Sequence, residues 1–256
     1  MTASKLLFAG LITLATALSI TRRAYVPAPL PLNAPLSELN TQPSLDFDKD
    51  SCYNVAAIGP DGTFAEGMKP SGAFSGGCRD ESDLDNSNVY SRSRCNGDWC
   101  VTIYDYYFEK DTSQTSGVGG HRHDWEHVAV WTNGGSIEYV ATSAHGGYTV
   151  KSRKDVLFHG DQGGAHPLVV YHKDGGFTHA FRFANGKDVE RPENHKGVFW
   201  RGALVGWEGY PDGLRDQLVE YEWEGPAAMA ITDEKFADEI KKAKPKGLVF
   251  DEERDF

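Results

Sequence analysis

The chain has 256 residues, of which 39% are hydrophobic and 25% charged, and its formal net charge is −11. Residues 1–24 carry three cations and no acid, so removing those three charges from −11 leaves −14 on the rest. Such an acidic chain is unsuited to bind a nucleic-acid backbone, and it gains little from simple attraction to anionic lipid. Its length suits one large domain or two small ones, and its 28 glycines and 11 tyrosines favour turns and strands over a helical bundle.

Residues 1–24 are typical of a secretion signal. Lys5 precedes an apolar run at 6–20, and small residues near 15–17 and at 23–24 suit a signal peptidase. A signal anchor is the alternative, but the run is short for a membrane span. Because no second run of spanning length follows, we expect a secreted, extracellular protein.

The next residues, 25–45, are rich in proline and lack a clear period, which predicts a loose N-terminal arm that becomes ordered near Leu45. We expect the folded domain to span residues 46–245, because no linker or internal repeat divides them. The last segment, 246–256, is an acidic tail that we expect to fray.

Four cysteines, Cys52, Cys78, Cys95 and Cys100, agree with export to an oxidising compartment. Three pairings are open to four cysteines, and proximity along the chain favours Cys52–Cys78 and Cys95–Cys100. A zinc site made of the four thiolates is the alternative, but no C-x-x-C pair is present.

Runs rich in β-branched and aromatic residues, bounded by turn residues, predict strands at 88–94, 101–108, 126–131, 136–142, 167–171 and 178–183. The first pair flanks an Asn-Gly turn and the second an Asn-Gly-Gly turn, so each pair reads as a hairpin. The stretch between the hairpins, 109–120, contains three glycines and is predicted to be a loop.

Two helices are predicted after the strands. The first follows Pro211 and the second follows Thr232, which is a candidate N-cap. On the second helix Phe236, Ile240 and Ala243 share one side. Many strands followed by two or three helices predict a mainly β protein, a single-domain β-sandwich with peripheral helices.

The segment 119–127 reads Gly-Gly-His-Arg-His-Asp-Trp-Glu-His and concentrates groups that bind metals or move protons. In a strand, Asp124 and Glu126 point one way, and Trp125 and His127 point the other. Two neighbouring carboxylates repel each other unless a cation or a proton lies between them. The alternative is a polar strand edge with ordinary salt bridges.

Residues 120–126, with the sequence GHRHDWE, match the signature of the necrosis- and ethylene-inducing-peptide-like proteins, the NLP cytolysins. Residues 101–111, 143–148 and 178–181 also look like stretches of that family. The resemblance covers roughly residues 46–245 and extends well beyond the seven contiguous signature residues: Gly120, His121, Arg122, His123, Asp124, Trp125 and Glu126.

The resemblance implies a secreted β-sandwich similar to actinoporin and fungal-lectin folds. Many members of the family permeabilise plant plasma membranes after binding the sugar head groups of glycosylated inositol-phosphoceramide sphingolipids, and so act in virulence. It also implies one divalent cation, Mg or Ca, in an acidic cavity lined by Asp111, His121, Asp124, Glu126 and His179. Such a protein is expected to be monomeric in solution.

Two rival functions remain open. Residues 123–127 satisfy H-x-x-E-H, the pattern of a class of zinc metalloproteases, which requires both histidines on one helical face. The glycines before this motif and the β-favouring run after it speak against a helix. The other rival is a sugar-binding, lectin-like family member without lytic activity.

Overall fold

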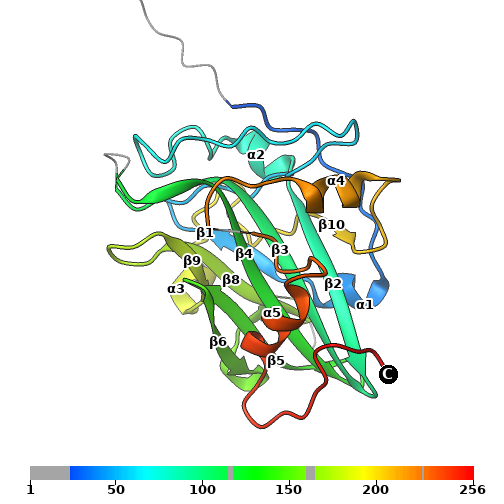
Figure 1. Cartoon of the computed structure of the whole chain (residues 1–256). Coiled ribbons are helices and arrows are strands. Elements are labelled where there is room, and N and C mark those ends of the chain that lie inside the picture. The colour runs from blue at the N-terminus through cyan, green and yellow to red at the C-terminus, as the bar shows by residue number, and fades with distance from the viewer. Residues whose placement is uncertain (1–23, 115–117, 160–164, 227) are drawn as a thin grey trace, which may run out of the picture.

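A computed structural model describes residues 24–114, 118–159, 165–226 and 228–256 and shows two packed β-sheets with short helices around them (Figure 1). The six-stranded sheet has the order β10 (Ala203–Gly206), β2 (Asn88–Asn96), β3 (Trp99–Thr112), β4 (Gly120–Asn133), β5 (Ser136–Ala144) and β6 (Gly147–Ser152). The second sheet joins β1 (Ser44–Phe47), β8 (His166–Lys173) and β7 (Phe158–His159), and β9 (His179–Phe183) also pairs with β8. The predicted mainly β sandwich is confirmed.

Strands β3 and β4 form the longest hairpin and run through the centre of the molecule (Figure 1). Their antiparallel register pairs Tyr107 with Trp125, and it continues to Asp111 opposite His121. The loop predicted at 109–120 is therefore wrong at both ends, because strand pairing extends to Thr112 and resumes at Gly120. Extending both strands places Asp111 and His121 on neighbouring strands at one end of the sheet.

Two apolar layers cover the two faces of the large sheet, and one of them lies between the sheets. Alternation along β3 sends Tyr104, Tyr106 and Phe108 between the sheets, where Phe108 stacks on Tyr171 of β8 with ring centroids 3.7 Å apart. On the other face of the large sheet, Trp131 is fully buried. This division explains why both faces of β3 carry bulky side chains.

In the described residues the helices are short: α1 (Leu36–Thr41), α2 (Glu81–Asp85), α3 (Gly186–Glu190), α4 (Leu214–Glu220), α5 (Phe236–Ala243) and the 3-10 helix η1 (Arg153–Asp155). The predicted helices α4 and α5 are present, and α5 buries Phe236, Ile240 and Ala243 as expected. Thr232 is not the N-cap, because α5 begins later, after Lys235, and has no side-chain cap. Among these helices there is none of sufficient length and apolar character to cross a membrane.

The N-terminal arm is ordered earlier than predicted. Leu30 is buried, its backbone N donates to Asn88 Oδ1 at 2.7 Å, and its carbonyl accepts from Asn88 Nδ2 at 3.0 Å. Long-range contact with β2 thus fixes a segment that has no local period. The predicted secretion signal lies almost entirely outside the described residues.

The C-terminal tail is attached to the turn between β2 and β3. Phe256 N donates to Cys95 O at 3.0 Å, Gly97 N donates to Phe256 O at 2.6 Å, and Cys95 N donates to Asp255 Oδ1 at 2.7 Å. These hydrogen bonds add backbone pairing at the end of the hairpin. The expectation that the tail frays is therefore wrong.

Both predicted disulfides are present, Cys52–Cys78 and Cys95–Cys100. The second joins residues that lie directly opposite each other in the β2–β3 ladder. All four cysteines are thus used, and a zinc site of four thiolates is excluded.

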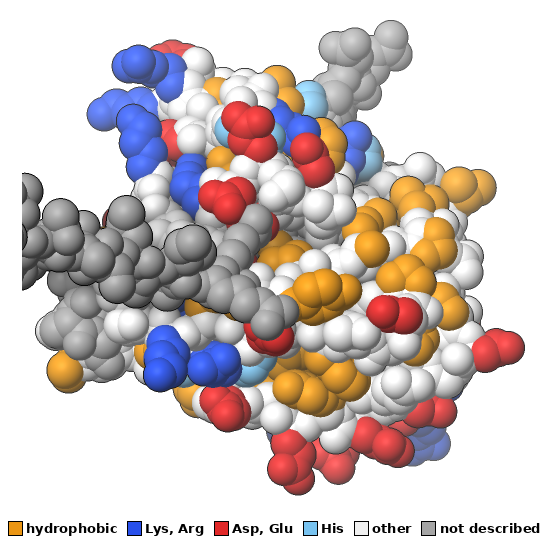
Figure 2. All heavy atoms as spheres, turned by 90° about the horizontal axis from the view of Figure 1, so that it is seen from above, with side chains coloured by type: hydrophobic (Ala, Val, Ile, Leu, Met, Phe, Trp, Pro, Cys, Tyr) orange, Lys and Arg blue, Asp and Glu red, His pale blue; other side chains and the backbone are white. Residues whose placement is uncertain are grey.

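Charged and apolar side chains occupy different parts of the end of the molecule that carries α2 and α4. Seen from above, Lys and Arg side chains gather toward one side of this face, and hydrophobic side chains gather over its middle (Figure 2). The net negative charge of the chain therefore does not make this end uniformly acidic.

Candidate metal centre

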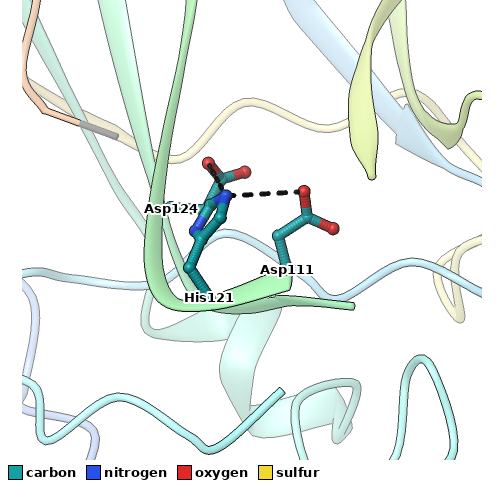
Figure 3. A group of neighbouring side chains, drawn as sticks. All are labelled: Asp111, His121 and Asp124. Atoms are coloured by element: carbon teal, nitrogen blue, oxygen red, sulfur yellow. Dashed lines mark ion pairs between the residues drawn. The ribbon is translucent and has the colours of Figure 1, made fainter. Parts of the chain in front are cut away.

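Three side chains, Asp111, His121 and Asp124, converge where β3 ends and β4 begins (Figure 3). His121 Nε2 lies 4.0 Å from Asp111 Oδ2 and 4.0 Å from Asp124 Oδ1. One potential ligand atom from each residue lies within 4.8 Å of the other two. Atoms that share one cation at about 2.0–2.6 Å lie at most about 5 Å apart, so these separations suit a single ion.

His121 reaches Asp124 because the strand is locally irregular. Strict alternation would send positions 121 and 124 to opposite faces of the sheet. His123 lies between them with a φ of +58°, a conformation that an L-residue rarely adopts. The turn of the backbone at His123 thus brings the side chain of His121 to the same side as Asp124.

The hydrogen bond of His121 Nδ1 sets which nitrogen faces the carboxylates. Nδ1 lies 2.7 Å from His123 O, and because a carbonyl only accepts, Nδ1 carries the hydrogen. In the neutral ring Nε2 then holds a lone pair, and this lone pair faces two carboxylates. Three electron-rich atoms facing one another fit a cation between them.

Asp111 is held from the other sheet by His179, the first residue of β9. Asp111 Oδ1 accepts from His179 Nδ1 at 2.7 Å, and both carboxylate oxygens accept from His179 N, at 2.9 and 3.0 Å. His179 Nε2 lies 3.1 Å from Asp50 O. Both ring nitrogens therefore have partners, and His179 lies behind Asp111 as the residue that orients it rather than as a fifth ligand.

Asp124 is likewise held from the other sheet. Tyr171 Oη donates to Asp124 Oδ2 at 2.8 Å. Burial, and then the charge of Asp111, raise the pKa of Asp124 to about 6. Both carboxylates of the cluster are thus held by hydrogen bonds from the second sheet. The crowding of negative charge is costly unless a cation or a proton offsets it.

Glu126 is the next residue on the same face of β4. It is buried, and its carboxylate accepts a hydrogen bond from Ser143 Oγ of β5. Burial, and then the charge of Asp124, raise the pKa of Glu126 well above its usual value. Glu126 therefore adds a third carboxylate beside the cluster.

A cavity of about 420 Å³ opens over these residues. Its floor contains Asp111, His121, Asp124 and Glu126, and its walls include Ser143, His145, Tyr148, Thr178 and, from the start of α5 onward, Lys235, Glu239 and Lys242. This volume lies in the range of small-ligand sites. The polar floor and the charged wall suit a ligand with many hydroxyl groups.

Other signature residues shape the backbone around the cluster. Gly120 has φ +116°, and a Cβ there would lie 2.5 Å from Asp111 O, so a side chain at this position would collide with the strand. Arg122 Nη1 donates to Glu66 O at 3.0 Å. His123 is buried, and burial followed by the charge of Arg122 lowers its pKa to about 4. We place these residues in the framework of the site.

The H-x-x-E-H interpretation does not fit this geometry. His123 Nδ1 lies 2.6 Å from Tyr107 Oη, and His127 Nδ1 lies 2.8 Å from Asp105 Oδ1, so the two histidines have separate partners. They lie on a strand, and the possible metal ligands grouped within the described residues include neither of them. Glu126 points to the other face, as the alternation predicts.

Trp125 belongs to the core rather than to a sugar platform. It is 3% exposed, and its ring packs against Tyr90, Tyr107 and Trp223. Its packing fixes β4 next to the cavity.

Sequence reasoning missed several residues of the site. Ser143 lies at the start of a stretch that looks familial, so a signal for it was available. Tyr171 and the residues on α5 had no such signal, because only the packing of distant segments brings them to the cavity.

Comparison with known proteins settles the family. A family model described as "Necrosis inducing protein (NPP1)" matches residues 37–243. The chain belongs to this family. "NLP effector protein 10" of Phytophthora capsici is 31% identical over 211 residues, covering 80% of this chain and 81% of the relative. "Necrosis-inducing protein NPP1" of Phytophthora nicotianae is 39% identical over 107 residues, covering 40% of this chain and 43% of the relative.

Solved structures of the family share the fold. A structure described as "NLPPya in complex with mannosamine" is 26% identical, has a TM-score of 0.68 and covers 86% of this chain and 97% of that chain. A structure described as "non-toxic HaNLP3 protein" is 27% identical, has a TM-score of 0.70 and covers 89% of this chain and 100% of that chain. One relative with this fold therefore binds an amino sugar, and another is described as non-toxic.

Proposed function

We propose that this family member is a secreted cytolysin that binds the sugar head groups of glycosylated inositol-phosphoceramide in plant plasma membranes and permeabilises them. Binding depends on one Mg or Ca ion held by Asp111, His121 and Asp124, with Glu126 beside them. The observation that carries the proposal is the lone-pair nitrogen of His121, which lies 4.0 Å from each of two buried carboxylates in the floor of a cavity.

The donor set supports a hard cation over zinc. Carboxylate oxygens dominate the cluster, and Mg and Ca prefer oxygen ligands completed by water or by ligand hydroxyls. When bound, the ion supplies a positive centre that accepts sugar hydroxyl oxygens. The protein's own part is to hold the ligands still: His179 fixes Asp111, and Tyr171 fixes Asp124.

The acidity of the chain supports selection by sugar rather than by lipid charge. A net charge of −11 gives no general attraction to an anionic membrane. Contacts inside the cavity must therefore supply most of the selectivity. The sugar complexes of one relative, with mannosamine and with glucosamine, support a carbohydrate ligand.

A lectin-like member that binds sugar without lysis is the second candidate, and the likeness to a non-toxic relative favours it. The two candidates share the cavity and its cation. They differ in whether the membrane is permeabilised after the sugar is bound, so only a measurement of membrane integrity separates them.

Dye release from vesicles is the test of the proposal. Leakage should occur from vesicles that contain glycosylated inositol-phosphoceramide, should stop when a chelator is added and should return with Mg or Ca. Plain phosphatidylserine vesicles are the control for lipid charge. Binding without leakage would establish the lectin-like candidate, and leakage that ignores the chelator would contradict the metal site.

Two variants sharpen this experiment. Asp124→Asn keeps the shape of the side chain and removes one charge from the cluster, so leakage should be lost while the thermal melt stays cooperative. Asp212→Asn removes a charge from an exposed turn residue that does not line the cavity, and it controls for a general charge effect. Incubation with unfolded casein and zinc tests the proposed absence of protease activity, and casein cleavage that requires Glu126 would contradict it.

A further inference from the structure

One side of α5 and the residue before it contribute to the wall of the cavity. Lys235, Glu239 and Lys242 all line the cavity and follow a spacing of four and three residues, so they lie on the same face of the helix. Asp238 and Lys241 do not line it. The cavity therefore has an acidic floor and a wall that carries two ammonium groups.

The two lysines differ in their partners. Lys242 Nζ donates to Glu239 Oε1 at 2.7 Å, and Tyr148 Oη donates to Glu239 Oε2 at 3.0 Å, so this pair is already satisfied. Lys235 is half-buried, and within the described part of the chain it makes no ion pair and no side-chain hydrogen bond. An ammonium on the lining of a cavity that has no partner of its own can donate charge-assisted hydrogen bonds to an anion that enters the cavity.

The pairing of the charged groups in the cavity points the same way. A divalent cation would offset Asp111 and Asp124, and the third carboxylate, Glu126, accepts a hydrogen bond from Ser143. Lys242 pairs with Glu239, so Lys235 is the lysine of the lining that has no ion-pair partner among the described residues. A neutral sugar would use this ammonium only as a hydrogen-bond donor, whereas a carboxylate or a phosphate would form a charge-assisted contact.

We propose that Lys235 determines specificity in this cavity and selects a sugar that carries an anionic group, a carboxylate or a phosphate, over its neutral counterpart. This inference rests on the proposed function, because it assumes that the cavity binds a sugar. It goes further in assigning a charge to the ligand and a role to a residue outside the signature.

Calorimetric titration with free sugars tests the inference without membranes. In saturating Mg, glucuronate and glucose 6-phosphate should each bind about tenfold more tightly than glucose, the size expected of one charge-assisted contact in a partly exposed site. Comparing the two acidic sugars separates recognition of a carboxylate from recognition of a phosphate. Inorganic phosphate alone should bind more weakly than glucose 6-phosphate, because it lacks the hydroxyls that the rest of the cavity would hold.

Three variants isolate the side chain. Lys235→Gln should bring glucuronate and glucose 6-phosphate down to the affinity of glucose, and Lys235→Arg should keep most of the preference. Lys241→Gln removes the same charge from an exposed position of the same helix that does not line the cavity, and it should change nothing. Mg affinity should not fall in Lys235→Gln, because the lysine acts on the sugar; a fall would place its effect on the cation ligands instead.

The inference would be overturned if glucose bound as tightly as the acidic sugars, or if Lys235→Gln kept the preference for them. It would also be overturned if the affinity for inorganic phosphate equalled that for glucose 6-phosphate, or if no sugar bound at all. The proposed function has a separate outcome. If leakage from glycolipid vesicles is sensitive to chelator but acidic sugars are not preferred, the proposed cytolysin function is supported and only the role of Lys235 is refuted.

Discussion

Replacing Tyr171 with phenylalanine removes one oxygen that links the two sheets at the metal centre. The hydroxyl donates to Asp124 Oδ2 at 2.8 Å, while the ring stacks on Phe108 with centroids 3.7 Å apart. Tyr171→Phe keeps the stack and deletes only the donor. The substitution therefore tests the hydrogen bond and leaves the packing of the sandwich in place.

Loss of this donor has two effects. A buried hydrogen bond to a charged acceptor contributes about 1.5–3 kcal/mol, so the free energy of unfolding without metal should fall by about that amount. Asp124 also loses the group that orients it, and loss of such a partner lowers metal affinity by about tenfold or more. The first effect is measured by urea denaturation and the second by calorimetric titration with Ca, both at a pH well above the pKa of Asp124.

Tyr106→Phe is the matched control. Tyr106 is also fully buried between the sheets, and its hydroxyl has no hydrogen-bond partner among the described residues. Its removal should leave Ca affinity unchanged and the free energy of unfolding unchanged or higher by about 1 kcal/mol. If Tyr171→Phe and Tyr106→Phe behaved alike in both measurements, the reasoning that Tyr171 positions Asp124 would be refuted.

Three further predictions concern the fold and the pH dependence of the site. Asp105→Ala leaves His127 and the backbone N–H of Ala230 without their buried acceptor, so urea denaturation should show a loss of about 3–5 kcal/mol, and an unchanged midpoint would contradict this. Replacing Cys52 and Cys78 together by alanine opens a loop with a sequence separation of 26. The free energy of unfolding should then fall by about 3.5 kcal/mol, and a loss near zero would show that the bridge does not constrain the unfolded chain. Burial and Asp111 raise the pKa of Asp124 to about 6 in the cation-free protein, so a cation must displace a proton below that pH. Apparent Ca affinity should then fall about tenfold for each pH unit, and a flat profile from neutral pH downward would argue against Asp124 as a ligand.

The sequence alone was enough for the features that depend on local pattern. The two-residue alternation of a strand predicted that Asp124 and Glu126 share a face and that Trp125 lies on the other, and the register with β3 confirms it. Proximity predicted both disulfides, because short separations close at low entropic cost. The apolar spacing of α5 predicted its buried side for the same local reason.

Local pattern was wrong where distant segments compete with it. The expected loop at 109–120 is strand at both ends, because pairing between Asp111 and His121 extends the ladder to Thr112 and Gly120. The acidic tail is ordered because the β2–β3 turn offers it backbone partners.

The resemblance implied the residues of the candidate metal centre, but only the tertiary structure shows how they are brought together and what holds them. His121 joins Asp124 through a positive φ at His123, a conformation that alternation does not predict. Tyr171 and His179 come from the second sheet, and Lys235 comes from the start of a helix more than a hundred residues after the signature. Strand periodicity determines which side chains share a face. Packing of the two sheets and of α5 determines which faces meet. Sequence pattern does not predict this packing, because apolar area is buried and hydrogen-bond partners are gained only when those distant segments come together.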